Sequence, residues 1–485
     1  MGEEYCNHLL ASAFLSTTRP SLHQLMDITF KNLGQIKKST LPVKQLSVII
    51  GPNNSNKTYV AYSIYGILRA LRRMPIGKSS IVRSGAGQWT LEVNRSLVRQ
   101  IRAATKKCVN QFVPSLTDFF QDTSSQLFAA TEFTVALTEA EILASLTNWD
   151  RDFNYRLPTN LRLAVSSGDS TIVARIIGKP GTDVPTVADE VDNDTAFRVI
   201  WQSLIRKVYP LPFLFPAERN AFVITYKTLI GNRNKELVAG RRIRRANLPL
   251  NAQPMLFENE PSFRYPRPVE DFLQFLYDSE QMHSFDGSNQ YSAIASLIET
   301  QLQDANRTHY RDSGTSPELA VRVSADLTID LYNASSSIKQ LAPLLIYLRQ
   351  RATPNDLIII DEPEMNLHPL SQAKLLEVLA ILVNSGIKVL LTTHSPYIMQ
   401  HLNNLVLQQV ASNRAKSVMS EALLLHDERA FLTQSQVGAY EMRDYELVSL
   451  ADEDYGIRWD TLSDVSLKLQ ELYFNITELE RSSDG

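Results

Sequence analysis

The sequence has few cysteines, no long apolar run and almost no net charge. Its two cysteines, Cys6 and Cys108, lie far apart without CxxC or histidine-rich neighbours, which argues against a disulfide framework or a zinc site. No apolar run reaches the ~18 residues of a membrane span, and the start MGEEYCNHLL lacks the features of a secretory signal. We therefore expect a soluble cytoplasmic protein without a membrane partner. The net charge of -3 argues against a chain that coats nucleic acid by bulk electrostatics.

The composition is that of an ordinary folded protein. With 485 residues, 44% of them hydrophobic and 21% charged, the chain can form two or three units with sizeable cores.

A candidate phosphate-binding loop lies at residues 51–58, GPNNSNKT, close to the pattern G-x-x-x-x-G-K-[ST]. The apolar run LSVII at 46–50 predicts a strand before it, and apolar spacing over 57–72 predicts a helix after it. In that context the loop amides and the helix N-terminus face a phosphate. The loop alone is equally compatible with an ordinary strand-turn-helix. If it binds phosphate, the contributing residues are Gly51, Pro52, Asn53, Asn54, Ser55, Asn56, Lys57 and Thr58.

Asn56 occupies the place of the second glycine in that pattern. Asparagine tolerates the left-handed backbone region, which costs a typical side chain about 1 kcal/mol. We therefore interpret Asn56 as a tolerated variant that adopts this conformation.

A second motif, DLIIIDEPEMNLHP at residues 356–369, lies about three hundred residues downstream. Its apolar part predicts a buried parallel strand that ends at Asp361 and Glu362. A helix over 370–383 and a strand over 387–392 complete a βαβ unit, and His394 follows in THSP. An acidic pair after such a strand can support a magnesium ion and activate a water molecule.

The intervening sequence predicts β-structure and helices. Alternating or clustered β-formers occur over 131–138, 161–167 and 170–177, and residues 269–304 have helical spacing without sustained heptads. The run RRIRR at 241–245 is a basic cluster that would contact DNA phosphates or an acidic partner, or form a solvated face.

These motifs together resemble the ATP-binding-cassette class of ATPase heads. The similar branch contains the overcoming-lysogenisation-defect proteins, recombination-repair ATPases of the SMC type and bacterial anti-phage ATPases. The resemblance implies an α/β fold: an ABC-type P-loop ATPase head with a mixed β-sheet core, an antiparallel β subdomain and a helical insertion. The expected units are the N-terminal head with the P-loop, the β-rich subdomain and connecting strand, the helical insertion, and the C-terminal head, at 1–125, 126–230, 231–326 and 327–485.

The same resemblance implies roles for the motif residues. Lys57 and Thr58 would hold the phosphates of ATP, with Thr58 and Asp361 at Mg²⁺. Glu362 would be the general base and His394 a sensor of the γ-phosphate, although a lone histidine after a strand is more often structural. The loop from Glu364 to His368 would contact the opposite protomer.

A candidate signature motif lies at Ser335, Ser336 and Ser337, where relatives have a glycine at the third position. In an ATP-sandwich dimer this motif would face the γ-phosphate bound by the partner; the alternative is a plain serine helix cap. The glycine departures at Asn56 and Ser337 predict slow turnover. The element PAER, with Glu218 and Arg219, matches the anti-phage branch but has no role that follows from the sequence.

The function expected from this resemblance is that of an ATP-hydrolysing switch in an anti-phage complex, as in the ATPase subunits of Septu and PARIS systems. Only 89 residues follow THSP, too few for a TOPRIM nuclease domain. The expected partners are therefore a second copy of the chain and a separately encoded effector, such as a TOPRIM or HNH nuclease, with DNA or a phage protein as the signal. Two alternatives stay open: an SMC- or RecF-like DNA-repair ATPase, and an ATP-bound scaffold with negligible turnover.

Overall fold

The structure of the 485-residue chain is a computed structural model. It describes residues 24–74, 81–85, 87–124, 126–147, 149, 152–156, 162–177, 191–231, 265–281, 289–312, 317–407, 423–452, 456–458, 468 and 470–474. The basic run 241–245 and Cys6 lie outside these residues, whereas Cys108 is buried and burial raises the pKa of its thiol. Within the described part of the chain, no helix has both the length and the apolar character needed to cross a bilayer.

The central element is a six-stranded mixed sheet in the order β10-β14-β15-β3-β16-β17. Its strands are β10 (Leu211–Phe215), β14 (Asp356–Asp361), β15 (Lys388–Thr393), β3 (Leu46–Ile50), β16 (Val437–Arg443) and β17 (Glu446–Ser449). The first five strands are parallel, and β17 pairs antiparallel with β16. Every residue of β3 and β14 is buried, which explains why both motifs end a continuous apolar run. The expected mixed-sheet α/β core is confirmed.

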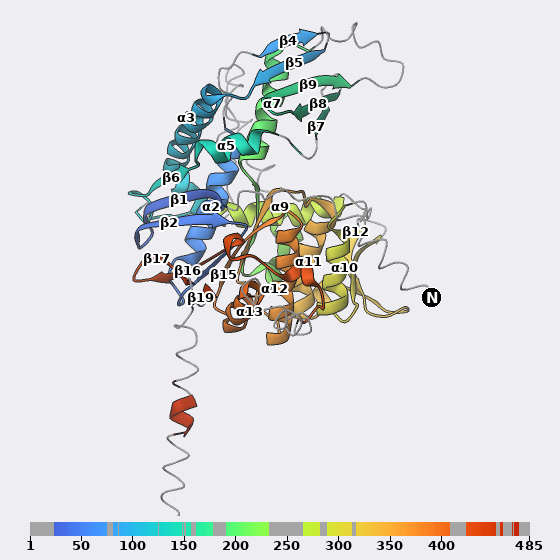
Figure 1. The fold of residues 1–485 in the computed structure, drawn as a ribbon. Coiled ribbons are helices and arrows are strands. Elements are labelled where there is room, and N and C mark those ends of the chain that lie inside the picture. The colour runs from blue at the N-terminus through green and yellow to red at the C-terminus, as the bar shows by residue number, and fades with distance from the viewer. Residues whose placement is uncertain are drawn as a thin grey trace, which may run out of the picture.

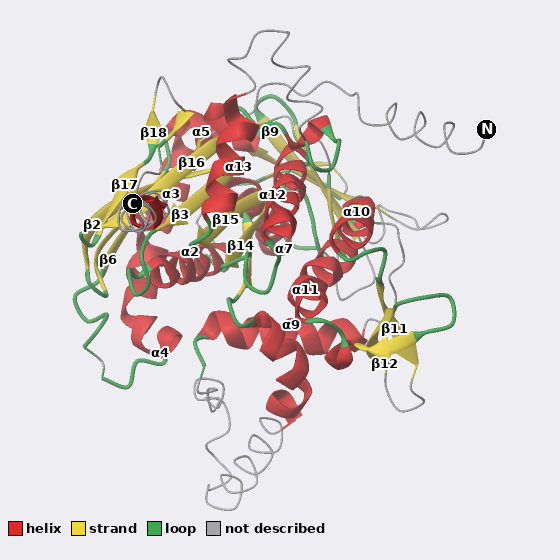
Figure 2. Cartoon of the chain, turned by 90° about the horizontal axis from the view of Figure 1, so that it is seen from below, coloured by secondary structure: helices red, strands yellow, loops and turns green. Residues whose placement is uncertain are grey.

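Helices cover this sheet and one another (Figures 1 and 2). The helix after the P-loop, α2 (Lys57–Arg72), packs against β10, β14 and β15. A second helical group consists of α10 (Ser292–Leu302), α11 (Ser336–Gln350), α12 (Pro369–Asn384) and α13 (Pro396–Leu407), in which α10 contacts α11 and α12, and α12 contacts α13.

Of the region expected as a helical insertion, 231–326, the described helices pack onto the head. They are α9 (Arg267–Gln281), which contacts α2, α11 and β10, and α10. They are followed by the antiparallel sheet β11-β12-β13, formed by β11 (Arg307–Asp312), β12 (Pro317–Arg322) and β13 (Thr328–Asp330). The apolar positions of α9 and α10 therefore form packing faces of the head.

Two antiparallel sheets lie beside the core. One has the order β2-β1-β6 and consists of β1 (Gln24–Leu33), β2 (Ile36–Lys44) and β6 (Glu132–Ala136). The other, drawn at the top of Figure 1, consists of β4 (Val82–Gly85), β5 (Gln88–Glu92), β9 (Thr171–Ile177), β8 (Arg162–Ser167) and β7 (Phe153–Arg156). The β-formers over 161–167 and 170–177 form the antiparallel β8–β9 pair.

Each of the two antiparallel sheets joins strands from both sides of residue 125, where a boundary between units is predicted. The five-stranded sheet takes β4 and β5 from before that boundary, while β6, which lies after it, pairs with β1. Alternation in a sequence identifies strands but not their partners, and here both pairings join distant segments. Helices α3 (Arg95–Phe112) and α7 (Asn193–Val208) contact these strands, and α5 (Glu139–Leu146) contacts α3 and α7.

Candidate active site

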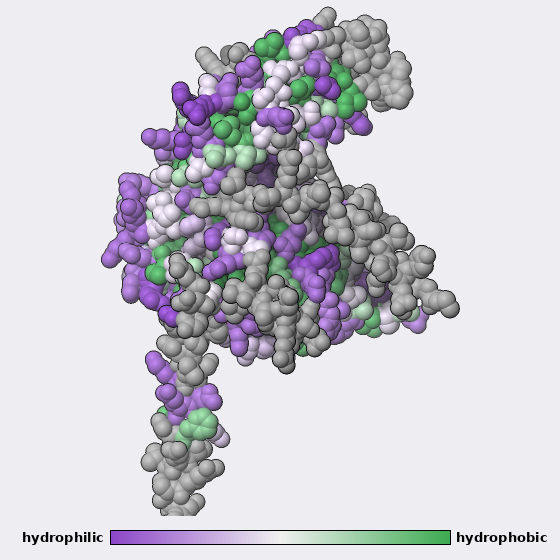
Figure 3. All heavy atoms as spheres, in the orientation of Figure 1, coloured by the Kyte–Doolittle hydropathy of each residue, from purple (hydrophilic) through white to green (hydrophobic). Residues whose placement is uncertain are grey.

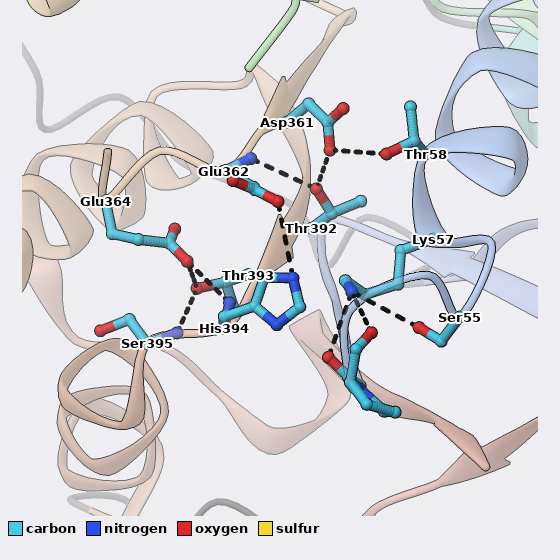
Figure 4. Close-up of polar contacts among 12 residues, drawn as sticks. Ser55, Lys57, Thr58, Asp361, Glu362, Glu364, Thr392, Thr393, His394 and Ser395 are labelled. Carbon is cyan, nitrogen blue, oxygen red and sulfur yellow. Dashed lines mark hydrogen bonds and ion pairs between the residues drawn. The ribbon is translucent and has the colours of Figure 1, made fainter. Parts of the chain in front are cut away.

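The motif residues meet where three neighbouring parallel strands end. In the order β14-β15-β3, the carboxyl ends lead into Glu362, His394 and the 51–58 loop respectively. Parallel strands bring their carboxyl ends to one edge of a sheet, which is the usual place for a ligand in such folds. Figure 4 shows the side chains from the three ends turned toward one another.

The backbone of the 51–58 loop has the curvature of a phosphate cradle. Gly51 has φ 150°, and a Cβ there would lie 3.0 Å from Met442 Cβ and from Ser55 Oγ. Asn54 and Asn56 are left-handed, with φ of 61° and 68°. Such turns bring successive amides to one side, where they can bind an anion.

Asn56 adopts the left-handed conformation expected from the sequence. It immediately precedes α2, and the Val60 amide donates to its carbonyl at 3.2 Å. Its side chain lies against the β1–β2 turn, because a Cβ built on Gly34 would be 3.1 Å from Asn56 Oδ1. The Asn56 Nδ2 atom is buried and has no hydrogen-bond partner among the described residues.

Lys57 is buried at the first position of α2, with 5% of its surface exposed. Its Nζ donates to the carbonyls of Gly51 at 3.1 Å and Pro52 at 2.9 Å, and to Ser55 Oγ at 3.4 Å. Burial lowers the pKa of the ammonium group, and the nearby Glu362 and Asp361 oppose that shift. The ammonium therefore sits within the loop, where it can exchange these carbonyls for phosphate oxygens.

Asp361 and Thr58 form the oxygen pair expected at a magnesium ion. Thr58 Oγ1 donates to Asp361 Oδ1 at 3.5 Å, and Thr392 Oγ1 donates to the same oxygen. Burial raises the pKa of Asp361 to about 6, although the Thr392 bond opposes that shift. Mg²⁺ is usually held by one or two carboxylates together with substrate phosphates and water, so a hydroxyl and a carboxylate beside a phosphate cradle suit it.

Glu362 faces His394 across the site. His394 Nε2 lies 3.5 Å from Glu362 Oε1, and this contact lowers the pKa of Glu362 against the opposing effect of burial. Glu362 has φ 48°, uncommon for a non-glycine residue, and its amide donates to the Thr392 carbonyl at 3.0 Å. An ionised, partly exposed carboxylate beside a histidine can accept a proton from water.

Glu364 bonds within its own protomer. Its Oε1 accepts from Thr393 Oγ1 at 2.8 Å and from the His394 amide at 2.6 Å, which fixes the loop after β15. Its Oε2 is buried without a hydrogen-bond partner among the described residues. At the other end of this loop His368 caps α12, accepting from the Leu370 amide at 3.3 Å. The side chains at the two ends of the loop thus have roles inside the chain that the resemblance did not indicate.

Arg219 is a site residue whose role the sequence did not reveal. It begins the helix at residues 219–231 after β10, and only 3% of its surface is exposed. Its Nη1 donates to the Asp361 carbonyl at 2.9 Å, and its Nη2 donates to the Glu362 carbonyl at 3.3 Å. The PAER element therefore holds the backbone of the acidic pair through Arg219. In the sequence, only its position directly after a strand could have indicated a role at the site.

The three signature serines lie at the exposed start of α11. Ser335 is the N-cap, accepting from the Ile338 amide at 3.3 Å, and its Oγ lies 3.0 Å from Ser337 Oγ. Ser335 and Ser336 are exposed. This is the cap geometry that both interpretations of the motif share.

Comparisons with known proteins agree with this site in part. Residues 285–400 match the family described as "AAA domain, putative AbiEii toxin, Type IV TA system". That span contains the signature serines, the acidic pair and His394, but not the 51–58 loop. No curated protein matches the sequence.

Several solved structures align over most of the chain at low identity. The Smc head bound to the C-winged helix domain of ScpA is 12% identical, covering 89% of this chain and 98% of that one, with a TM-score of 0.36. The Smc head domain with an extended coiled coil bound to the C-terminal domain of ScpA, from Pyrococcus furiosus, is 14% identical and covers 93% and 99%, with a TM-score of 0.34. The SMC head domain from Thermotoga maritima is 11% identical and covers 89% and 99%, with a TM-score of 0.28.

The family match makes residues 285–400 similar to an AAA domain. Next to the matched acidic pair and His394, the 51–58 loop has the pattern of a P-loop, and the three strand ends meet at one edge of the sheet. This arrangement suits the phosphates of a nucleotide.

Proposed function

We propose that this chain binds Mg²⁺–ATP and hydrolyses it slowly, as the switch subunit of an anti-phage defence complex with a separately encoded effector. The observation that carries the ATPase proposal is the meeting of Lys57, Thr58, Asp361, Glu362 and His394 at one sheet edge. The description of the matched family as a toxin of a toxin-antitoxin system supports a role in which two encoded components act together.

In the proposed mechanism each residue acts from the position that it has in the structure. Lys57 turns from the Gly51 and Pro52 carbonyls to the β- and γ-phosphates, and the loop amides and the α2 N-terminus bind the same oxygens. Thr58 and Asp361 would hold Mg²⁺, which neutralises phosphate charge when bound. Glu362 takes a proton from the attacking water, while His394 holds that carboxylate and senses the γ-phosphate.

We further propose that ATP is enclosed between two copies of the chain. Ser335 and Ser336 are exposed at a helix start, where a hydroxyl and free amides can bind the γ-phosphate of a partner. An effector held by the ATP-bound assembly would be released or activated when the signal changes the nucleotide state.

The test compares wild type with Lys57→Ala and Glu362→Gln. Lys57→Ala removes the loop cation, so we expect loss of ATP binding by calorimetry. Glu362→Gln keeps the shape of the side chain but cannot accept a proton, so ATP should stay bound while turnover falls by about 10²–10⁴. Unchanged ATP affinity in Lys57→Ala would exclude the assigned site, and wild-type turnover in Glu362→Gln would exclude the general base.

A basic helix surface favours the alternative of a DNA-responsive ATPase. Helix α3 contains no acidic residue, and Arg95, Arg99, Arg102 and Lys106 are exposed at spacings of four, three and four, which places them on one face. Hydrophilic side chains gather over this helix in Figure 3. DNA-stimulated turnover that Arg99→Glu with Arg102→Glu abolishes would support this alternative, and turnover indifferent to DNA would argue against it.

A further inference from the structure

The buried guanidinium of Arg219 joins two parts of the head that have different proposed roles. Its Nη1 and Nη2 bond the carbonyls of Asp361 and Glu362, and Nη1 also bonds the Pro216 carbonyl at 3.0 Å. Its Nε bonds the Gln340 carbonyl at 3.2 Å, on the second turn of α11. With its amide oxygen turned to the guanidinium, the Gln340 side chain accepts a further bond from Nη2 at 2.6 Å. One side chain thus links the general base to the helix that begins with the signature serines.

These bonds are unusual for a buried cation. Among the described residues, no carboxylate lies within ion-pair distance of the Arg219 guanidinium, and the recorded partners are carbonyls. Burial lowers the pKa of Arg219 to about 10, and the more distant charges of Asp361 and Glu364 oppose that shift. The planar guanidinium has five donors spread over three nitrogens and so reaches carbonyls on separate segments, whereas the three donors of a lysine ammonium share one nitrogen, so lysine cannot replace all of these bonds.

Arg219 bonds α11 beside a gap in the backbone hydrogen bonds of that helix. Pro343 lies inside α11 and has no amide to donate to the Lys339 carbonyl. The next carbonyl along the chain, that of Gln340, accepts from Arg219 Nε. On the other side, Arg219 bonds the carbonyl of Glu362, whose left-handed φ of 48° is a conformation that only a fixed environment maintains.

We propose that Arg219 is a positioning residue that holds the Glu362 peptide in this conformation and transmits movement of α11 to it. The proposal rests on the ATPase function proposed above. In an ATP-sandwich dimer, α11 would touch the nucleotide of the partner, whereas Glu362 acts on the nucleotide of its own protomer. Arg219 therefore connects the two sites: capture of one ATP by the Ser335 end of α11 sets the general base at the other.

The decisive experiment compares Arg219→Lys with Arg349→Lys. Arg349 is a matched control, because it is an arginine of α11 with only 12% of its side chain exposed, and its bidentate bonds to Glu299, at 2.9 and 2.7 Å, lie outside the proposed site. Mg²⁺–ATP affinity, kcat and Tm are measured for both variants and the wild type. We expect Arg219→Lys to lower kcat about 10- to 100-fold with the ATP Kd within threefold. Arg349→Lys should lower Tm while kcat stays within twofold.

The dependence of rate on ATP concentration tests the connection between sites. We expect a sigmoidal curve for the wild type and a hyperbolic one for Arg219→Lys, because the variant separates the two sites. A hyperbolic wild-type curve would overturn the connection.

Other outcomes separate the failure of this inference from failure of the proposed function. Wild-type kcat in Arg219→Lys, with only Tm lowered, would show that Arg219 is merely structural. Absence of turnover in the wild type would instead refute the ATPase. If Arg219→Lys does not fold, Gln340→Met is the second variant, because it removes only the side-chain acceptor of Arg219. We then expect a kcat at least threefold lower than that of the wild type, with an unchanged ATP Kd. An unchanged kcat in Gln340→Met would refute the inference.

Discussion

Replacement of Asn56 by glycine tests whether the atypical loop is a tolerated variant or a specialised one. In the structure Asn56 has a left-handed φ of 68°. We expect the loop to keep this conformation with and without nucleotide, so its cost, about 1 kcal/mol for an ordinary side chain and less for asparagine, belongs to the folding free energy and not to the binding free energy. The variant should bind Mg²⁺–ATP with nearly the wild-type affinity.

The effect on stability should also be small, because opposing terms nearly cancel. Glycine relieves the left-handed strain and removes the buried Nδ2 that has no partner among the described residues. It also loses the contact of Oδ1 with the turn at Gly34 and increases the entropy of the unfolded chain, at roughly 0.5–1 kcal/mol. We expect the free energy of unfolding to change by less than about 1 kcal/mol.

Asn56→Ala is the matched control, because alanine removes the same amide but keeps a Cβ. It should destabilise the protein by about 1–2 kcal/mol, the cost of left-handed geometry. Calorimetric titration with Mg²⁺–ATP and thermal unfolding without nucleotide measure the two effects separately. Loss of ATP binding in both variants would refute the reasoning, since it would mean that the amide contacts the nucleotide. Affinity more than about fivefold tighter in Asn56→Gly would show that the loop is not preformed.

Three further predictions concern neighbouring residues. Burial raises the pKa of Asp361 from 3.8 to about 6, so the folded protein binds a proton more tightly than the unfolded chain does. Without Mg²⁺, loss of the proton from Asp361 should lower the free energy of unfolding by up to about 3 kcal/mol as pH rises from 4 to 6. Asp361→Asn should abolish this part of the pH dependence of Tm. His394→Ala removes the contact with Glu362 at 3.5 Å, so kcat should fall by about 10-fold or more with little change in ATP affinity; equal kcat in the variant would contradict its role. Gly51→Ala should weaken ATP binding and lower Tm, because its Cβ would lie 3.0 Å from Met442 Cβ and Ser55 Oγ at φ 150°; wild-type binding would show that the loop can adjust.

The sequence predicts the central sheet well because the motifs and the buried strands coincide. LSVII and LIII are continuous apolar runs because β3 and β14 lie in the interior of a covered parallel sheet. The residues that follow these strands are placed by the sheet itself, so Lys57 and Glu362 meet although about three hundred residues separate them in the sequence. The left-handed Asn56 was also predictable, since few other non-glycine residues accept that conformation.

The pairing of the outer strands could not be predicted in the same way. Residues 132–136 alternate like an ordinary edge strand, and nothing local distinguishes pairing with β1 from pairing with β8. The contacts of Glu364 and Arg219 were hidden for a related reason. Each bonds backbone groups of a distant segment, the His394 amide in one case and the Glu362 carbonyl in the other, and a backbone group leaves no trace in the amino-acid pattern.

The hydrogen bonds around Lys57 and Asp361 would make the proposed turnover slow even with every catalytic group in place. Lys57 is already bonded to the Gly51 and Pro52 carbonyls, and Asp361 is bonded to Thr58 and Thr392. ATP binding must exchange these bonds for bonds to phosphate and metal, so part of the interaction energy is spent before any transition state forms. Glu362 is held differently, through backbone bonds to Thr392 and Arg219 that nucleotide does not need to break. With the proposed roles of these residues, the protein would bind ATP in one step and hydrolyse it in another that depends on α11, as a switch, rather than a fast ATPase, requires.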